Sequence, residues 1–120
     1  GPNMDHVVVS GRRVWVIDSK RWQKGTYWSV GSQTFRWPLH TAHTHERTMR
    51  WALDVLKKDG IHARGLYVIH GDVQLRGCRP NGHQAMTTAE FRSWIEHLTE
   101  TGDPRLVSQL ARRINHPTRR

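Results

Sequence analysis

Two carboxylates and one amine near the start of the chain have types and a spacing that suit phosphate chemistry. Asp5 begins one β-branched run, Asp18 ends the next, and Lys20 follows it by two residues. If the two runs form a hairpin with a two-residue loop at Gly11-Arg12, the numbers of cross-strand partners sum to 23. Asp5 then faces Asp18 with their Cβ atoms about 5 Å apart. Lys20 projects from the same face of the sheet as Asp18.

This grouping predicts metal-assisted hydrolysis of a phosphodiester. Two carboxylates in opposite positions repel each other unless a counter-charge neutralises them. Mg²⁺ takes one or two carboxylates, keeps several waters and accepts phosphate oxygens, and Lys20 would polarise the attacking water or hold the phosphate. The alternative is structural: Asp5 only begins a strand, and Asp18 forms an exposed ion pair with Lys20, worth under about 1 kcal/mol. The interpretation depends on a register that a loop one residue longer would break.

The elements that must position these residues indicate an α/β fold, a mixed β-sheet flanked by α-helices. The expected strands lie at 5–9, 14–18, 26–30, 33–37 and 65–70, with Pro38 ending the second hairpin. One helix is expected at about 41–58, and a second begins at a capping box formed by Thr87 and Glu90, with Phe91, Trp94, Ile95 and Leu98 on its apolar face. A third is expected from Pro104 onward, with Asp103 as its N-cap. Residues 71–86 are expected to be mostly loop, with a short strand at 73–76.

The residues around these carboxylates resemble the core of the nuclease-related domain, or NERD domain. The resemblance begins with Asp5–Val9, continues after a Gly-containing turn with Val14–Lys20, and includes the Lys-rich segment 20–25 that ends in Gly. It extends to Trp37-Pro38 before the long helix and to the strand at 66–70. The NERD domain belongs to the PD-(D/E)xK superfamily, so the resemblance implies a restriction-endonuclease-like core and a metal-dependent nuclease or a nucleic-acid-binding module derived from one.

The same resemblance implies roles for individual residues. Asp5 and Asp18 would bind Mg²⁺ or Mn²⁺, Lys20 would be the catalytic lysine, and the main-chain carbonyl of Ser19 would be a further metal ligand. The family usually has Glu where this chain has Asp18, a change that the wider superfamily tolerates. It also commonly has Gln after the Pro at the start of the long helix, for which His40 is the nearest substitute here.

The charge of the chain favours a polyanionic partner. Lys and Arg number 19 against 10 Asp and Glu, a net charge of +9, and both halves of the chain are positive. We therefore expect DNA as the partner, with RNA as the alternative, and no membrane partner because no apolar run is long enough to span one. The residues expected to bind nucleic acid gather near the second hairpin: Arg21, Trp22, Lys24, Arg36 and His40. Trp28 and Trp37 are further candidates, and the alternative is that the tryptophans cover the apolar face of the hairpin itself.

Two other groups of residues carry weaker interpretations. His40, His43 and His45 could hold zinc only if the helix there began irregularly, so solvated histidines or phosphate contacts are preferred. Cys78 lies between Arg76 and Arg79, which would lower the pKa of its thiol, but no catalytic partner is evident. A single cysteine fits a reducing compartment, and the family resemblance implies a cytoplasmic protein.

We expect one domain over residues 3–116. Gly1-Pro2 resembles the remnant of tag removal, 117–120 form a basic tail, and the N-terminal helix of the family is expected to be cut away or supplied by another chain. A homodimer and a larger parent protein both stay open. The expected activity is DNA cleavage with little sequence specificity. The alternatives are an inactive domain of the same fold that binds nucleic acid, and an assembly domain that binds a partner protein through the Trp-rich hairpin.

Overall fold

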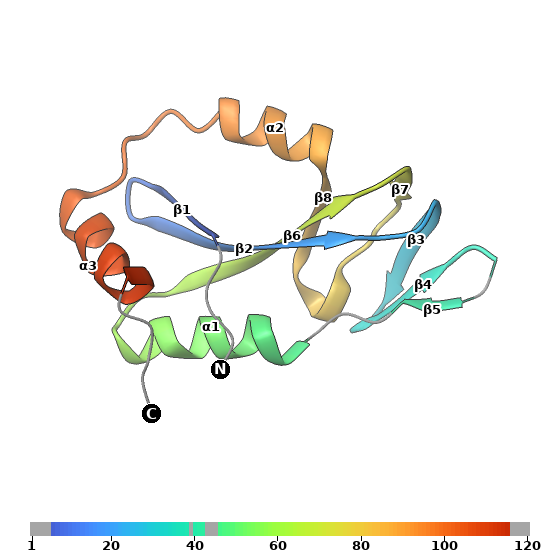
Figure 1. Cartoon of the computed structure of the whole chain (residues 1–120), viewed down its shortest axis with the longest axis horizontal. Coiled ribbons are helices and arrows are strands. Elements are labelled where there is room, and N and C mark those ends of the chain that lie inside the picture. The colour runs from blue at the N-terminus through green and yellow to red at the C-terminus, as the bar shows by residue number, and fades with distance from the viewer. Residues whose placement is uncertain (1–5, 39, 43–45, 116–120) are drawn as a thin grey trace.

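Within the residues it describes, 6–38, 40–42 and 46–115, the computed structural model shows two four-stranded sheets and three α-helices (Figure 1). The first sheet has the order β1 (His6–Ser10), β2 (Arg13–Arg21), β6 (Ala63–His70), β8 (Gln84–Thr87). The second has the order β5 (His40–Ala42), β4 (Gln33–Arg36), β3 (Gly25–Val30), β7 (Val73–Leu75). The helices are α1 (Glu46–Lys58), α2 (Thr88–Glu96) and α3 (Pro104–Asn115), with a 3₁₀ turn η1 (Pro80–Gly82). The predicted α/β class is confirmed, but the strands divide into two mixed sheets instead of one.

The first hairpin has the predicted loop and register. β1 and β2 are antiparallel with Val7 opposite Val16, and the two-residue loop begins at Gly11. Gly11 has a φ of 59°, in the left-handed region that a two-residue hairpin loop requires. β2 continues to Arg21, three residues beyond the predicted end, because it also pairs in parallel with β6.

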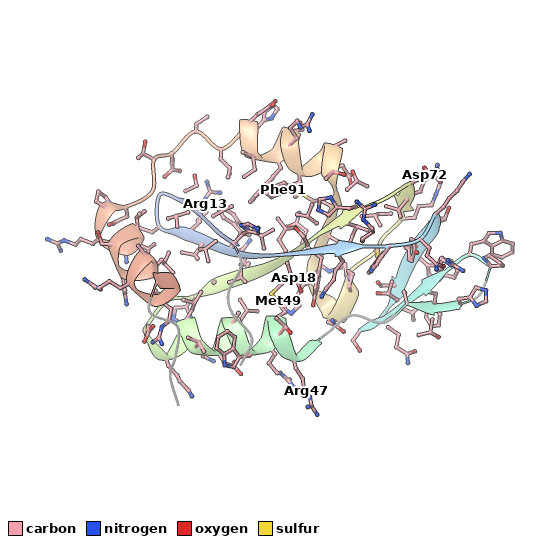
Figure 2. The ribbon with its side chains drawn as sticks, viewed as in Figure 1. Arg13, Asp18, Arg47, Met49, Asp72 and Phe91 are labelled. Carbon is pink, nitrogen blue, oxygen red and sulfur yellow. The ribbon has the colours of Figure 1, made fainter. Side chains whose placement is uncertain are left out.

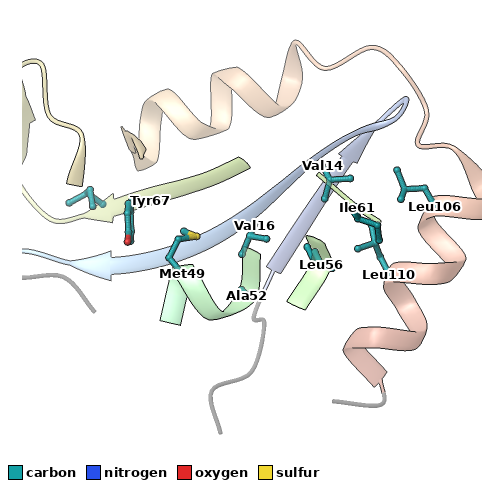
Figure 3. Close-up of a cluster of buried hydrophobic side chains, with 10 residues drawn as sticks. Val14, Val16, Met49, Ala52, Leu56, Ile61, Tyr67, Leu106 and Leu110 are labelled. Carbon is teal, nitrogen blue, oxygen red and sulfur yellow. The ribbon is translucent and has the colours of Figure 1, made fainter. Parts of the chain in front are cut away.

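Alternate residues of β2 and β6 contribute to two hydrophobic clusters on opposite faces of the first sheet. The α1-side cluster also includes residues of α3 and is shown in Figure 3: Val14, Val16, Met49, Ala52, Leu56, Ile61, Tyr67, Ile69, Leu106 and Leu110. The α2-side cluster consists of Trp15, Ile17, Leu66, Val68 and Met86. Trp15 meets Trp94 of α2 edge-on, with ring centroids 4.9 Å apart. Burial on both faces explains why the sequence of β2 is almost continuously apolar from Val14 to Ile17.

The predicted helix over 41–58 begins later than expected. α1 starts at Glu46, and the preceding residues His40–Ala42 form β5, antiparallel to β4 with His40 opposite Arg36. The chain reverses direction at Trp37-Pro38 and returns beside β4. A three-residue edge strand has too little periodicity of its own to be recognised, since its neighbour defines it.

The segment 71–86 contains two short strands. β7 confirms the strand expected at 73–76, whereas β8 lies where loop was predicted. β8 pairs in parallel with the buried strand β6 and so completes the first sheet. As with β5, the pairing partner is distant in sequence and gives no local signal.

The ends of α2 and α3 confirm the predicted caps. Thr87 and Glu90 form both hydrogen bonds of the capping box. Oδ1 of Asp103 accepts hydrogen bonds from the backbone N–H groups of Leu106 and Arg105, and these bonds lower the pKa of Asp103 below its usual value. Ile95 was predicted on the apolar face of α2 but is 37% exposed. Of the helices in the described part of the chain, none has the length and apolarity needed to cross a membrane.

Candidate functional site

Asp18 and Lys20 lie on the face of the first sheet that α1 covers. Both are in phase with Val16 of the α1-side cluster, because every second residue of a strand points to the same face. Figure 2 shows Asp18 on the same side of the sheet as Met49 of α1, whereas Phe91 lies on the side of α2. The two side chains therefore share one face, as their spacing predicted.

The Asp18 carboxylate and the Lys20 amine form a largely buried ion pair. Nζ of Lys20 lies 3.3 Å from Oδ2 of Asp18, and the side chains of Lys20 and Asp18 are only 20% and 13% exposed. Oδ2 of Asp18 is buried and accepts no hydrogen bond. The exposed ion pair of the structural alternative is therefore not what the structure shows. Buried carboxylate oxygens normally have hydrogen-bond partners, so this one has lone pairs left for a further cation.

The main-chain carbonyl of Ser19 points away from β6, in the plane of the sheet. The N–H of Trp22 donates to the carbonyl of His70 at 3.0 Å. Backbone groups of successive residues in a strand point to opposite sides, so the carbonyl of Ser19 is directed toward β1. The described pairing of β1 with β2 ends at His6 opposite Ile17. The Ser19 carbonyl therefore lies beyond the last described pair, next to Asp18 in the chain.

The other predicted metal ligands cannot be placed. Asp5 lies outside the described residues, as do His43 and His45. His40 is exposed in β5. Among residues 6–38, 40–42 and 46–115, no three His, Cys, Asp or Glu side chains are grouped closely enough to hold a metal ion. The described chain thus offers oxygen ligands of two kinds here, the carboxylate of Asp18 and the carbonyl of Ser19.

A cavity of about 380 Å³ lies between the end of β2 and the second sheet, beginning at the residue after Lys20. It is lined by Arg21, Trp22, Gln23, Tyr27, Arg36, His40, Thr41 and Ala42. Four of the five residues predicted to bind nucleic acid are therefore brought together. The fifth, Lys24, lies outside the lining, and its Nζ is 3.8 Å from Oδ2 of Asp72, with both side chains exposed.

Four residues of the lining were not predicted from the sequence: Gln23, Tyr27, Thr41 and Ala42. Tyr27 lies opposite Arg36 in the register of the second hairpin. The predicted loop at Gly31-Ser32 fixes that register, so it could have identified Tyr27. Thr41 and Ala42 had no comparable signal, because they belong to the unpredicted strand β5.

The inner wall of the cavity is held by contacts around Gln23. Tyr27 is 3% exposed, and its hydroxyl donates to the main-chain carbonyl of Gln23 at 2.7 Å. The centroid of its ring lies 4.5 Å from that of Trp22. Arg36 donates through Nη1 to the side-chain oxygen of Gln23, whereas its Nε is buried without a hydrogen-bond partner. Arg36 therefore has an unused donor.

The remaining tryptophans of the hairpin differ in exposure. Trp28 is half-buried and stacks on Phe35 with ring centroids 5.9 Å apart, so it covers a face of the hairpin as the alternative proposed. Trp37 is 65% exposed.

The predicted lowering of the Cys78 pKa is wrong. Cys78 is buried, and loss of solvent around its sulfur raises the pKa of the thiol above its usual value. The hydroxyl of Ser29, which lies 3.9 Å from Sγ, partly opposes this effect. A thiol of this kind is mostly protonated and unreactive near neutral pH.

Comparison with protein families gives a match over more than half of the chain. A family model described as a nuclease-related domain matches residues 2–70. The match ends at the last residue of β6, so it includes Asp18, Lys20 and the entire lining of the cavity. No curated protein and no solved structure gives a significant match.

Proposed function

The chain belongs to the nuclease-related domain (NERD) family, and from that premise we propose that it is a metal-dependent nuclease that hydrolyses DNA phosphodiester bonds. The observation that carries this function is the buried pair of Asp18 and Lys20, in which Oδ2 of Asp18 accepts no hydrogen bond. A largely buried carboxylate oxygen that has an ammonium group 3.3 Å away but accepts no hydrogen bond is costly to maintain, and such groups concentrate at functional sites.

The residues at this position fit a hard divalent cation. Asp18 and Asp5 through their carboxylates, and Ser19 through its main-chain carbonyl, would hold Mg²⁺ or Mn²⁺, both of which prefer oxygen ligands. The fit rests on Oδ2 of Asp18, which accepts no hydrogen bond, and on the direction of the Ser19 carbonyl. When bound, the ion would make a water molecule more acidic and offset negative charge on the reacting phosphate.

Lys20 would orient the attacking water or hold a phosphate oxygen. In the reaction, the water oxygen bonds to phosphorus, one P–O ester bond breaks, and the proton lost by water is balanced by the proton gained by the departing oxygen. The products are a phosphomonoester end and a hydroxyl end. A fixed ammonium group beside the phosphate stabilises the charge that develops in the transition state.

The substrate would be gripped through its phosphates. We assign this role to Arg21, Trp22, Lys24, Arg36 and His40, supported by the net charge of +9 and by the four that line one cavity. Phosphate contacts carry no base information, so we expect little sequence specificity. DNA is the proposed substrate and RNA the alternative. We propose a cytoplasmic location from the family resemblance, and a single cysteine fits such a reducing compartment.

Nuclease activity is tested by incubating supercoiled plasmid, single-stranded DNA and RNA with the protein in Mg²⁺, Mn²⁺ or EDTA. We expect DNA cleavage with either metal and none in EDTA. Asp18→Asn and Lys20→Met should each reduce the rate by at least about 100-fold. Lys57→Met is the matched control, because it removes one exposed positive charge from the last turn of α1 and should retain the wild-type rate.

Metal binding has a second readout that does not depend on cleavage. Mn²⁺ should raise the melting temperature of the wild type, since a ligand at 100 times its Kd stabilises the folded state by about 2.7 kcal/mol. Asp18→Asn should lose this increase, and Lys57→Met should keep it.

Two results would contradict the nuclease function. If the wild type binds DNA in a salt-sensitive way but cleaves nothing with either metal, the domain is a nucleic-acid-binding module. If it instead retains a protein partner at about 0.5 M salt, where binding through phosphates collapses, the domain serves assembly.

A further inference from the structure

We propose that the cavity between β2 and the second sheet is a phosphate-binding subsite, which holds a phosphate group next to the one on which Asp18 and Lys20 act. That the phosphate belongs to a nucleic-acid strand rests on the proposed nuclease function. That the cavity binds an anion rests on the residues of its lining alone.

The lining has positive charge that no acidic residue compensates. Of its eight residues, two are arginines and one is histidine, and none is Asp or Glu. Neither Arg21 nor Arg36 forms an ion pair with a carboxylate in the described part of the chain, whereas Arg12, Arg13 and Arg113 do. Clefts lined by charge of one sign attract ligands of the other.

The guanidinium group of Arg36 is oriented by Gln23, and one of its N–H donors has no acceptor in the protein. Its Nη1 is occupied by the side chain of Gln23, and its buried Nε has no acceptor. A planar guanidinium with free N–H groups matches the geometry of phosphate oxygens better than any other side chain does. His40 lies opposite Arg36 on the neighbouring strand, so both side chains leave the same face of the second sheet.

The aromatic residues of the lining favour a phosphate over a stacked base. The ring of Tyr27 is buried beside Trp22, and its hydroxyl already donates to Gln23. The rings therefore form a rigid wall for the arginines and offer no pair of open aromatic faces for a base. The cationic groups of the lining are the guanidinium groups of Arg21 and Arg36 and the imidazole of His40.

The cavity is close enough to the ion pair for one strand to reach both. Asp18, Lys20 and Trp22 are alternate residues, and the N–H of Trp22 continues the hydrogen bonding of β2 to β6. At about 3.3 Å per residue, the Cα atoms of Lys20 and Trp22 are separated by about 6.6 Å. An extended nucleic-acid strand spans such a distance in one or two nucleotides.

The subsite is tested by binding in EDTA, in an Asp18→Asn background of the whole chain. A fluorescent single-stranded oligothymidylate, with or without a 5′-phosphate, is titrated by anisotropy at several salt concentrations. Arg36→Gln should weaken binding at least about tenfold, because a charged hydrogen bond is lost. It should also reduce the slope of log K against log salt by about 0.7, the value for one phosphate contact on a single strand.

Two further variants separate the subsite from general charge and from folding. Arg92→Gln removes the same charge from an exposed position on α2 and should change the affinity less than about twofold. Ala42→Phe fills the cavity without altering charge and should weaken binding as much as Arg36→Gln does. Melting temperatures show that each variant is folded.

Each outcome of this titration is decisive. Wild-type binding by both Arg36→Gln and Ala42→Phe, or an equal loss in Arg92→Gln, would overturn the subsite. A loss confined to the 5′-phosphorylated strand identifies a terminal phosphate as the ligand, and a loss with both strands identifies an internal phosphodiester. Because no cleavage is measured, failure of the nuclease assay leaves this result unaffected, and the reverse also holds.

Discussion

At the scale of single residues, the pair of Asp18 and Lys20 is asymmetric. Asp18 has a short side chain, only 13% exposed, on a nine-residue strand, so its carboxylate has little freedom to turn toward solvent. Lys20 has a long, flexible stem near the strand end, and its amine can turn outward if its partner is removed. Removing the Lys20 amine therefore leaves the Asp18 carboxylate largely buried without a counter-charge. Removing the Asp18 carboxylate leaves an amine that can turn toward solvent.

We accordingly expect Lys20→Met to lower the free energy of unfolding by about 1–3 kcal/mol more than Asp18→Asn does. Urea denaturation of both variants measures the difference. Mn²⁺ should restore part of the stability of Lys20→Met, since the cation replaces the lost positive charge beside Asp18. Equal stability of the two variants would show that the carboxylate is adequately solvated without Lys20.

At the scale of elements, the two sheets are joined where β2 leads into β3 and where β6 leads into β7. β2 and β6 are paired in the first sheet, and the strands that follow them in the chain, β3 and β7, are paired in parallel in the second. The N–H of Gly25 donates to the carbonyl of Asp72 at 3.2 Å where the chains pass between sheets. Gly71, with a φ of 122°, lies at this junction, and a Cβ there would collide with the main-chain oxygen of Trp22. The cavity therefore depends on a close approach of two backbones.

Replacing Gly71 should thus disturb the cavity as well as the turn. Gly31→Ala is the control, because Gly31 also has a positive φ but has no atom within 4 Å of the added Cβ, and it should cost about 1–2 kcal/mol. Gly71→Ala should cost more than that, since it adds a backbone clash to the unfavourable φ. Denaturation curves and the anisotropy titration measure both effects. Equal stability and equal affinity of the two variants would contradict this account of the junction.

At the scale of the whole molecule, the positive charge is distributed along the chain. Residues 1–60 carry 10 basic and 5 acidic side chains, and residues 61–120 carry 9 and 5. The molecule extends 46 × 36 × 21 Å, and its longest dimension is several times the Debye length of about 8–10 Å, so charges at its far ends are largely screened from the ion pair. These distributed charges attract nucleic acid to the protein, while the cavity and the ion pair determine the position of the bound strand.

Affinity for DNA should therefore fall steeply with salt. Between 50 and 200 mM NaCl we expect the Kd for a duplex in EDTA to increase by more than about tenfold, because each neutralised phosphate releases counterions. Duplexes of unrelated sequence should behave alike. A Kd that is independent of salt would indicate that the charge serves some other partner.

Much of the site follows from local sequence. The Gly11-Arg12 loop fixes the register of the first hairpin, period-two alternation places Asp18 and Lys20 on one face, and short-range hydrogen bonding accounts for the caps at Thr87 and Asp103. Each of these depends on residues a few positions apart, whose preferences the chain carries wherever it folds. The family resemblance drawn from the same residues is confirmed.

Only the tertiary structure decided what lies around that pair. β5 and β8 exist because β4 and β6 offer edges to pair with, and the division into two sheets depends on where the chains cross at Gly71. The burial of Asp18 and the position of Thr41 and Ala42 beside Arg21 and Arg36 depend likewise on contacts between distant segments. The free energy of such contacts comes from pairing and packing that exist only after folding, so no local pattern in the sequence could have contained them.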